Sequence, residues 1–166
     1  MVLILLIRAV YLISRSGLLL VDRVYGNVEN APDPIMVSSF FSALLTFSNE
    51  SVKQLANALD PSGAGIAGGQ IDAFTYGSFR FLFYEQSHIF AVLVVSRAAD
   101  LEMVRPLGEK ILEKFLNTYG VHHGSSPDMS IYEPFRPEMD RILVQDIDLA
   151  PVRTEIEFFK NLLQVP

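Results

Sequence analysis

Short apolar and aromatic segments occur in two blocks along the chain, and each segment has the length of a β-strand. The first block is divided by Ser14-Arg15-Ser16-Gly17, a tight turn in which Gly17 is able to adopt a positive φ. We therefore expect an opening hairpin with strands at residues 4–14 and 18–25. The second block predicts three further strands in immediate succession, at residues 71–76, 79–84 and 89–96.

The first apolar run is also hydrophobic enough to be considered as a signal peptide or a membrane anchor. No positive charge precedes it, and Arg8 interrupts it well short of the roughly 18 residues that a spanning helix needs. Its β-branched and aromatic residues favour a buried strand instead. We therefore expect a strand here and no integral membrane anchor.

A long helix is expected between the two blocks. Asp33 followed by Pro34 is typical of a helix start, and Asp60-Pro61 predicts that the helix ends after Leu59. At 100° per residue its apolar side chains form two adjacent stripes that together span about 200°. The first stripe is Met36, Phe40, Ala43, Leu44 and Phe47, and the second is Val37, Phe41, Leu45, Val52 and Leu55.

These two stripes are wider than one sheet requires, because an apolar sector of somewhat over about 100° is enough to dock a helix. Two interpretations follow from the excess. Either one stripe contacts another molecule, or a wide sheet and its flanking loops bury both stripes within one copy of the chain.

The order of strands in the sheet follows from how continuous their hydrophobic runs are. The first strand and the fifth, residues 89–96, are apolar almost throughout, which indicates burial on both faces. We expect these two strands to be central neighbours, which predicts an antiparallel sheet with strand order 2-1-5-4-3. Strands two and three then form the edges, the long helix covers one face, and the later helices cover the other.

Helical patterns follow the second block. A helix is expected from residues 98–100 to Gly120, with Pro106 predicting either a kink or a delayed start. Residues 121–134 resemble a loop, and two further helices are expected at residues 135–146 and 152–163. The predicted fold is α+β with topology ββαβββαα plus a C-terminal helix. It forms a single domain over residues 1–166, with its core at 4–147 and a helical extension at 150–164.

Composition excludes several classes of function. The chain has 166 residues, of which 50% are hydrophobic and 19% charged, as expected for a globular protein. With 13 basic and 19 acidic residues its net charge is −6, so nucleic acid is not an expected partner. The absence of cysteine excludes disulfides and thiolate chemistry, and it is compatible with the cytoplasm.

Candidate chemistry is sparse. His122, His123 and Asp128 are suitable ligands for a metal ion, but no helix or hairpin spacing fixes them in place. His88 falls at a strand turn, where we expect it to face water. The glycine-rich residues 62–69 lack the lysine-serine or lysine-threonine pair of a phosphate loop. We therefore predict no catalytic, cofactor-binding or metal-binding residue, and no enzymatic activity.

Several segments, in this order, resemble the longin domain, and particularly the small stand-alone longin-like proteins of archaea that are related to eukaryotic trafficking machinery. The resemblance covers residues 4–147. Roadblock domains have a similar sheet but usually begin with a helix, whereas this chain begins with a strand. The segments are Ser16-Gly17-Leu18-Leu19-Leu20, residues 40–48, residues 77–83 and residues 100–107 leading into Phe115-Leu116.

The resemblance implies a profilin-like fold that acts by binding other proteins. Its members form dimers and platforms for small Ras-like GTPases, so the implied partners are a second copy, another longin or roadblock-type protein, and a GTPase. No SNARE-like heptad follows the domain, so a role in membrane fusion is not expected. The resemblance implies that the first helix and the strand-three edge make the contacts, through Phe41, Leu45, Val52, Ile71, Ala73 and Phe74.

A second hypothesis stays open at this point. Related sandwich folds hold small molecules between sheet and helices, which would make the chain a sensor or an enzyme.

Overall fold

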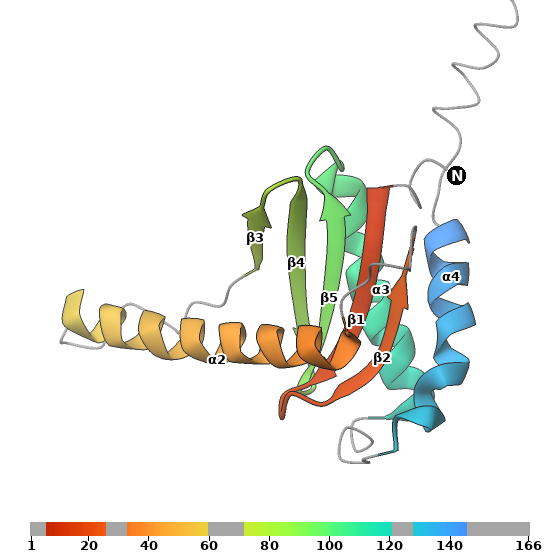
Figure 1. Ribbon diagram of the computed structural model, residues 1–166, viewed down its shortest axis with the longest axis horizontal. Coiled ribbons are helices and arrows are strands. Elements are labelled where there is room, and N and C mark those ends of the chain that lie inside the picture. Colours follow the sequence, from red (N-terminus) through yellow and green to blue (C-terminus); the bar gives the residue numbers. More distant parts are fainter. Residues whose placement is uncertain (1–5, 26–32, 60–71, 121–127, 146–166) are drawn as a thin grey trace, which may run out of the picture.

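The computed structural model describes residues 6–25, 33–59, 72–120 and 128–145, apart from several side chains in the second half of the long helix. The chain forms five strands, three α-helices and one 3₁₀ helix within these ranges (Figure 1). In chain order they are β1 (Ile7–Ser14), β2 (Leu19–Val24), α2 (Pro34–Leu59), β3 (Ala73–Tyr76), β4 (Phe79–Gln86), β5 (Ile89–Ser96), α3 (Leu101–Tyr119), the 3₁₀ helix η2 (Met129–Phe135) and α4 (Arg136–Gln145).

The five strands form one antiparallel sheet with the order β2-β1-β5-β4-β3, which confirms the predicted order. At the centre, Tyr11 of β1 lies opposite Val92 of β5 and Asp22 of β2. Gly17 in the first hairpin turn has a φ of +89°, as its position in the sequence predicts. Most residues of β1 and β5 are buried, because helices cover both faces of the sheet.

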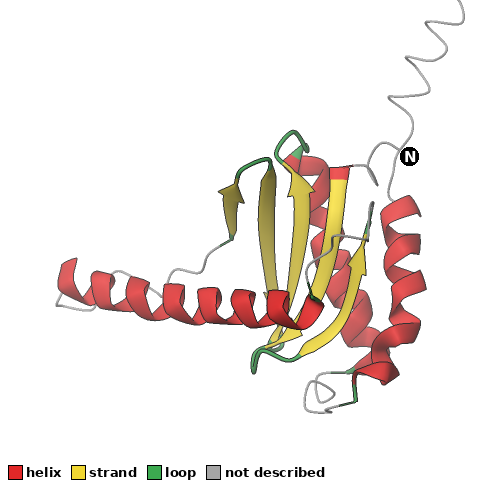
Figure 2. Ribbon diagram, viewed as in Figure 1, coloured by secondary structure: helices red, strands yellow, loops and turns green. Residues whose placement is uncertain are grey.

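The molecule has three layers. Helix α2 crosses one face of the sheet, while α3 and α4 lie on the other (Figure 2). The core between the sheet and α3 is the larger one and includes Leu93, Ile111 and Phe115. The core on the α2 side is smaller and is built around Tyr11 and Phe41. None of the helices in the described ranges is long and apolar enough to cross a bilayer.

The region after β5 differs from the sequence expectation at one point and decides between two alternatives at another. The predicted loop at residues 121–134 contains the 3₁₀ helix η2, which begins at Met129 because Asp128 caps it by accepting the N–H of Ser130 at 3.0 Å. Tyr132 and Phe135 anchor this helix in the core. Helix α3 begins at Leu101, so Pro106 lies inside the helix and the delayed start is excluded, while the kink stays a prediction.

Some predicted features lie outside the described residues. These are the start of the first strand before Leu6, the glycine-rich segment at residues 62–69, the pair His122 and His123, and the C-terminal helix at residues 152–163.

The two edges of the sheet differ in what covers them. Along β2, the Arg23 guanidinium donates to both carboxylate oxygens of Asp140 in α4, at 3.0 and 2.7 Å. The Tyr25 hydroxyl donates to the same carboxylate at 2.9 Å, and Arg136 is ion-paired with Asp22 at 2.8 Å. Helices η2 and α4 are therefore fastened along β2. Strand β3, at the opposite edge, is exposed along most of its length.

Helix α3 packs closely on β4 at Gly108. A Cβ atom at this position would overlap the aromatic ring of Tyr84. We expect Gly108→Ala to lower the free energy of unfolding by about 1–3 kcal/mol, because the ring has to leave its rotamer. Urea denaturation measures this, and Gly108→Ala combined with Tyr84→Leu should recover most of the loss. An equal loss in the single and double variants would contradict the assignment of the effect to this contact.

Candidate interaction surface

Helix α2 is fixed at its start and docks through a narrow stripe. The Asp33 carboxylate accepts the N–H of Ile35 at 2.9 Å, and Pro34 occupies the first helical position, where a backbone N–H is not needed. Among the described side chains of α2, the buried ones are Ser38, Phe41 and Leu45. Their spacing of three and four residues places them on one face of the helix. Val37 and Leu44 are half-buried and pack against the same core.

Phe41 is the centre of this docking contact. Its ring lies 6.0 Å from that of Tyr11 in β1 and 5.6 and 5.7 Å from those of Phe81 and Phe83 in β4, measured between centroids. These distances and tilted orientations are typical of stabilising aromatic pairs. Phe74 of β3 stacks on Phe81 with centroids 4.5 Å apart, so the aromatic contacts continue to the edge strand.

A second apolar stripe of α2 lies beside the docking stripe, and its largest side chains are exposed. Met36, Phe40 and Phe47 are 71%, 56% and 70% exposed. Large apolar side chains in a continuous exposed row indicate a contact surface for another molecule, whereas single exposed ones are common. The structure therefore distinguishes the two stripes: Phe41 and Leu45 of one are buried on the sheet, whereas Met36, Phe40 and Phe47 of the other stay exposed. Leu44 of that second stripe is half-buried against the same core.

Strand β3 is a short edge strand, and most of its side chains are exposed. Ala73, Thr75 and Tyr76 are exposed, and Phe74 is half-buried under its aromatic stack. On one side β3 pairs with β4, from Ala73 opposite Leu82 to Tyr76 opposite Phe79. As the last strand of the sheet, it has an outer row of backbone groups that no strand within the described residues pairs with.

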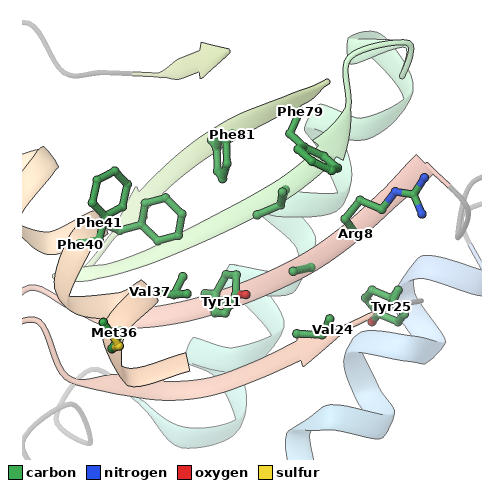
Figure 3. A pocket seen from close by; sticks show the side chains of 12 residues that line it. Arg8, Tyr11, Val24, Tyr25, Met36, Val37, Phe40, Phe41, Phe79 and Phe81 are labelled. Atoms are coloured by element: carbon green, nitrogen blue, oxygen red, sulfur yellow. The ribbon is translucent and has the colours of Figure 1, made fainter. Parts of the chain in front are cut away.

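An open groove of about 550 Å³ lies between α2 and the part of the sheet that α2 leaves uncovered. Figure 3 shows Met36, Phe40 and Phe41 of α2 at one end, and Arg8 and Tyr25 at the other. Most of the lining is apolar. The lining residues are Arg8, Ala9, Tyr11, Val24, Tyr25, Met36, Val37, Phe40, Phe41, Phe79, Phe81 and Val94.

Arg8 is the charged residue of this lining. Its side chain is exposed, and it has no ion-pair partner among the residues that the structure describes. The Tyr25 hydroxyl is engaged by Asp140, and burial raises the pKa of Tyr25. Burial also raises the pKa of Tyr11, so both phenols stay neutral near pH 7. The groove is thus an uncharged trough with one cation at its end.

The six residues predicted from the sequence as partner contacts have different surroundings. Phe41 and Leu45 are 2% and 3% exposed and belong to the core under α2. Ala73 is exposed and Phe74 half-buried on β3. The side chain of Val52, and Ile71 as a whole, lie outside the described residues. Whether these residues contact a partner stays a prediction.

Sequence reasoning did not select Met36, Phe40, Phe47 or Arg8. The first three belong to a stripe that was visible at helical spacing, but two adjacent stripes with a phenylalanine each cannot be ranked without the sheet they face. For Arg8 the sequence held no comparable signal, because an arginine in an apolar run gives no indication of which groove its strand borders.

The described residues contain few groups arranged for chemistry. They hold no cluster of three or more histidine, aspartate or glutamate side chains that is suited to a metal ion. His88 lies exposed in the turn between β4 and β5, with its Nδ1 at 3.2 Å from a guanidinium nitrogen of Arg15.

Comparison with known proteins identifies the fold. No protein-family model and no curated sequence matches the chain. Among solved structures, MglB of Myxococcus xanthus matches 68% of this chain and 85% of its own with 14% identity and a TM-score of 0.50. A homology model of the full-length AP-3 complex in a stretched open conformation contains a chain that matches 86% of this one and 81% of its own, with 10% identity and a TM-score of 0.53.

A roadblock/LC7 domain from Streptomyces avermitilis also matches, over 69% of this chain and 85% of its own, with 14% identity and a TM-score of 0.49. At these identities the likenesses concern the fold alone. The chain shares its fold with the MglB structure and with the matching chain of the AP-3 model.

Phe41 and Phe47 provide a contrast between core and surface on the same helix. Phe41→Ala should lower the free energy of unfolding by about 3–5 kcal/mol, because it leaves a cavity among the rings of β1 and β4. Phe47→Ala should change it by less than about 0.5 kcal/mol in dilute solution. Chemical denaturation of both variants measures the difference. Similar losses for the two would contradict the orientation of α2.

Proposed function

We propose that this chain is a non-enzymatic, longin-like module for protein–protein interaction, which dimerises through α2 and the β3 edge. The observation that carries this proposal is the apolar stripe of α2 whose side chains Met36, Phe40 and Phe47 are more than half exposed. In the dimer this stripe and β3 are covered by a second copy or by another longin or roadblock-type protein.

The length of α2 supports the proposal. Its 26 residues span about 39 Å at 1.5 Å per residue. A five-stranded sheet is only about 19 Å wide between its outer strands, at about 4.8 Å per strand. By these dimensions a helix that crosses the strands extends about 20 Å beyond the sheet. Figure 1 shows that α2 continues past β3. Within the part of the chain that the structure describes, no layer lies against this half of α2.

The open edge supports the same contact. Strand β3 has an outer row of N–H and C=O groups that no described strand pairs with, and pairing of such edges is a common way to join two sheets. The other edge is a poorer choice, because η2 and α4 are fastened along β2. Burial of an exposed Met36, Phe40 or Phe47 side chain contributes about 1.5–3 kcal/mol when it is complete. In a symmetric dimer each of these side chains is buried twice, once from each copy, so its contribution to the association counts twice.

The more specific part of the proposal rests on the resemblance to longin domains. It is that the dimer presents a surface to a small Ras-like GTPase in a trafficking-type assembly of the cytoplasm. A pull-down with GTPases locked in each nucleotide state tests this part. Binding that depends on the nucleotide state is the expected result, and the absence of binding in both states would contradict it.

Phe47→Glu tests the dimer itself. Phe47 is exposed, so the substitution should leave the fold intact while placing a carboxylate in the apolar contact. Light scattering should give the mass of two chains for the natural sequence and of one chain for the variant. Met103→Glu is the matched control, since Met103 is an exposed apolar residue of α3 on the opposite face.

Two results would contradict the dimer. One is a natural chain that stays monomeric at high concentration, and the other is a Phe47→Glu variant whose mass equals that of the Met103→Glu control.

The groove favours a second candidate function, the binding of an apolar small molecule between the sheet and α2. Its volume of about 550 Å³ falls in the range of ligand pockets, about 300–1,000 Å³. The two functions predict different responses to an apolar fluorescent probe. In a ligand-binding monomer the probe binds at any protein concentration, whereas in a dimer it is displaced as the chain associates.

A further inference from the structure

The groove between α2 and the sheet, whose use as a ligand site is the second candidate function above, has two ends of different polarity (Figure 3). We infer that it binds a single-chain amphiphile with a carboxylate head group, a ligand of the fatty-acid type. The carboxylate pairs with Arg8, and the apolar chain extends from there toward α2. Such a ligand presupposes that candidate function, and it requires no second copy of the chain.

Arg8 reaches the groove because β1 carries a bulge. The register of β1 against β5 shifts between Ile7 and Ala9, which makes Arg8 the extra residue. Ile7 packs in the core on the α3 side and Ala9 in the core on the α2 side, although residues two apart in a regular strand share a face. As a result, Arg8 and Ala9 both line the groove, although they are consecutive. The bulge thus re-aims a charged side chain toward the apolar face of the sheet.

Arg8 is also available to an incoming anion, because the carboxylates on the neighbouring β2 and α4 are already paired. Asp22 pairs with Arg136 at 2.8 Å, and Asp140 pairs with Arg23 at 2.7 Å. The described part of the chain offers Arg8 no ion-pair partner, and the other residues that line the groove are uncharged. A carboxylate head group therefore meets a guanidinium, which can bind it through two hydrogen bonds, and no competing acidic side chain.

The rest of the groove suits an apolar chain. Side chains of β1, β2, β4 and β5 form its floor, and the exposed Met36 and Phe40 of α2 lie at the end opposite Arg8 (Figure 3). Each methylene group buried there strengthens binding about 4-fold. The net charge of −6 opposes attachment to an anionic bilayer, which favours a dispersed amphiphile over a membrane surface as the ligand.

The test compares probes that share a ten-carbon chain and differ in the head group: decanoate, decanol and decyltrimethylammonium, each below the concentration at which it forms micelles. Calorimetric titration gives the dissociation constants. Decanoate should bind most tightly and the cationic probe most weakly, and octanoate should bind up to about 15-fold more weakly than decanoate. The titrations are repeated in Phe47→Glu, in which the groove stays open whether or not the natural chain dimerises, since Phe47 does not line it.

Arg8→Ala should weaken the binding of decanoate about 3- to 10-fold and leave that of decanol within about two-fold. A loss of fold would weaken both probes alike, so their difference reports on the head group. Lys114→Ala is the matched control, because Lys114 is an exposed cation of α3 on the opposite face of the sheet. It should change neither affinity by more than about two-fold.

Each failure has its own result. Equal binding of the charged and uncharged probes, or equal effects of Arg8→Ala on decanoate and decanol, would overturn the anionic ligand and leave the groove as an apolar site. Absence of binding of every probe, in the natural chain and in Phe47→Glu, would overturn the ligand site itself, as expected if another part of the chain fills the groove. Neither result bears on the dimer.

Discussion

The mismatch between the length of α2 and the width of the sheet constrains the rest of this molecule. The helix is fastened by one narrow stripe, with Phe41 packed among the rings of Tyr11, Phe81 and Phe83. That contact fixes the rotation of the helix, so Met36, Phe40 and Phe47 of the neighbouring stripe stay exposed. It also fixes the position of the helix, so its second half passes beyond β3 (Figure 1). The packing of Phe41 therefore accounts both for the exposed apolar side chains of α2 and for the second half of the helix that extends beyond the sheet.

The two edges of the sheet differ in how they are covered, which indicates the edge at which a partner can pair. Ion pairs from Arg23 and Arg136 hold η2 and α4 along β2, and the Tyr25 hydroxyl strengthens the same cluster. Nothing comparable within the described residues covers β3. A partner that pairs with β3 meets the unsupported half of α2 at once, so the contact through the strand and the contact through the helix reinforce each other.

Much of the fold could be predicted from the sequence because its signals are local. The continuous apolar runs of β1 and β5 placed these strands at the centre, and Asp33-Pro34 marked the start of α2. The orientation of α2 could not be predicted, because Phe40 and Phe41 lead two stripes of similar character and only contacts with distant strands choose between them. Helix η2 was missed because a 3₁₀ helix with Pro134 lacks the α-helical period, and its stability comes from burying Tyr132 and Phe135.

Hydrogen exchange as a function of protein concentration tests the central claim most directly, because it reports on the unsupported half of α2 without any substitution. If a second copy covers this segment, the amides of residues 47–59 and of β3 should be protected at high concentration and lose protection together on dilution, while those of α3 stay unchanged. Exchange of residues 47–59 that is the same at every concentration would contradict the account.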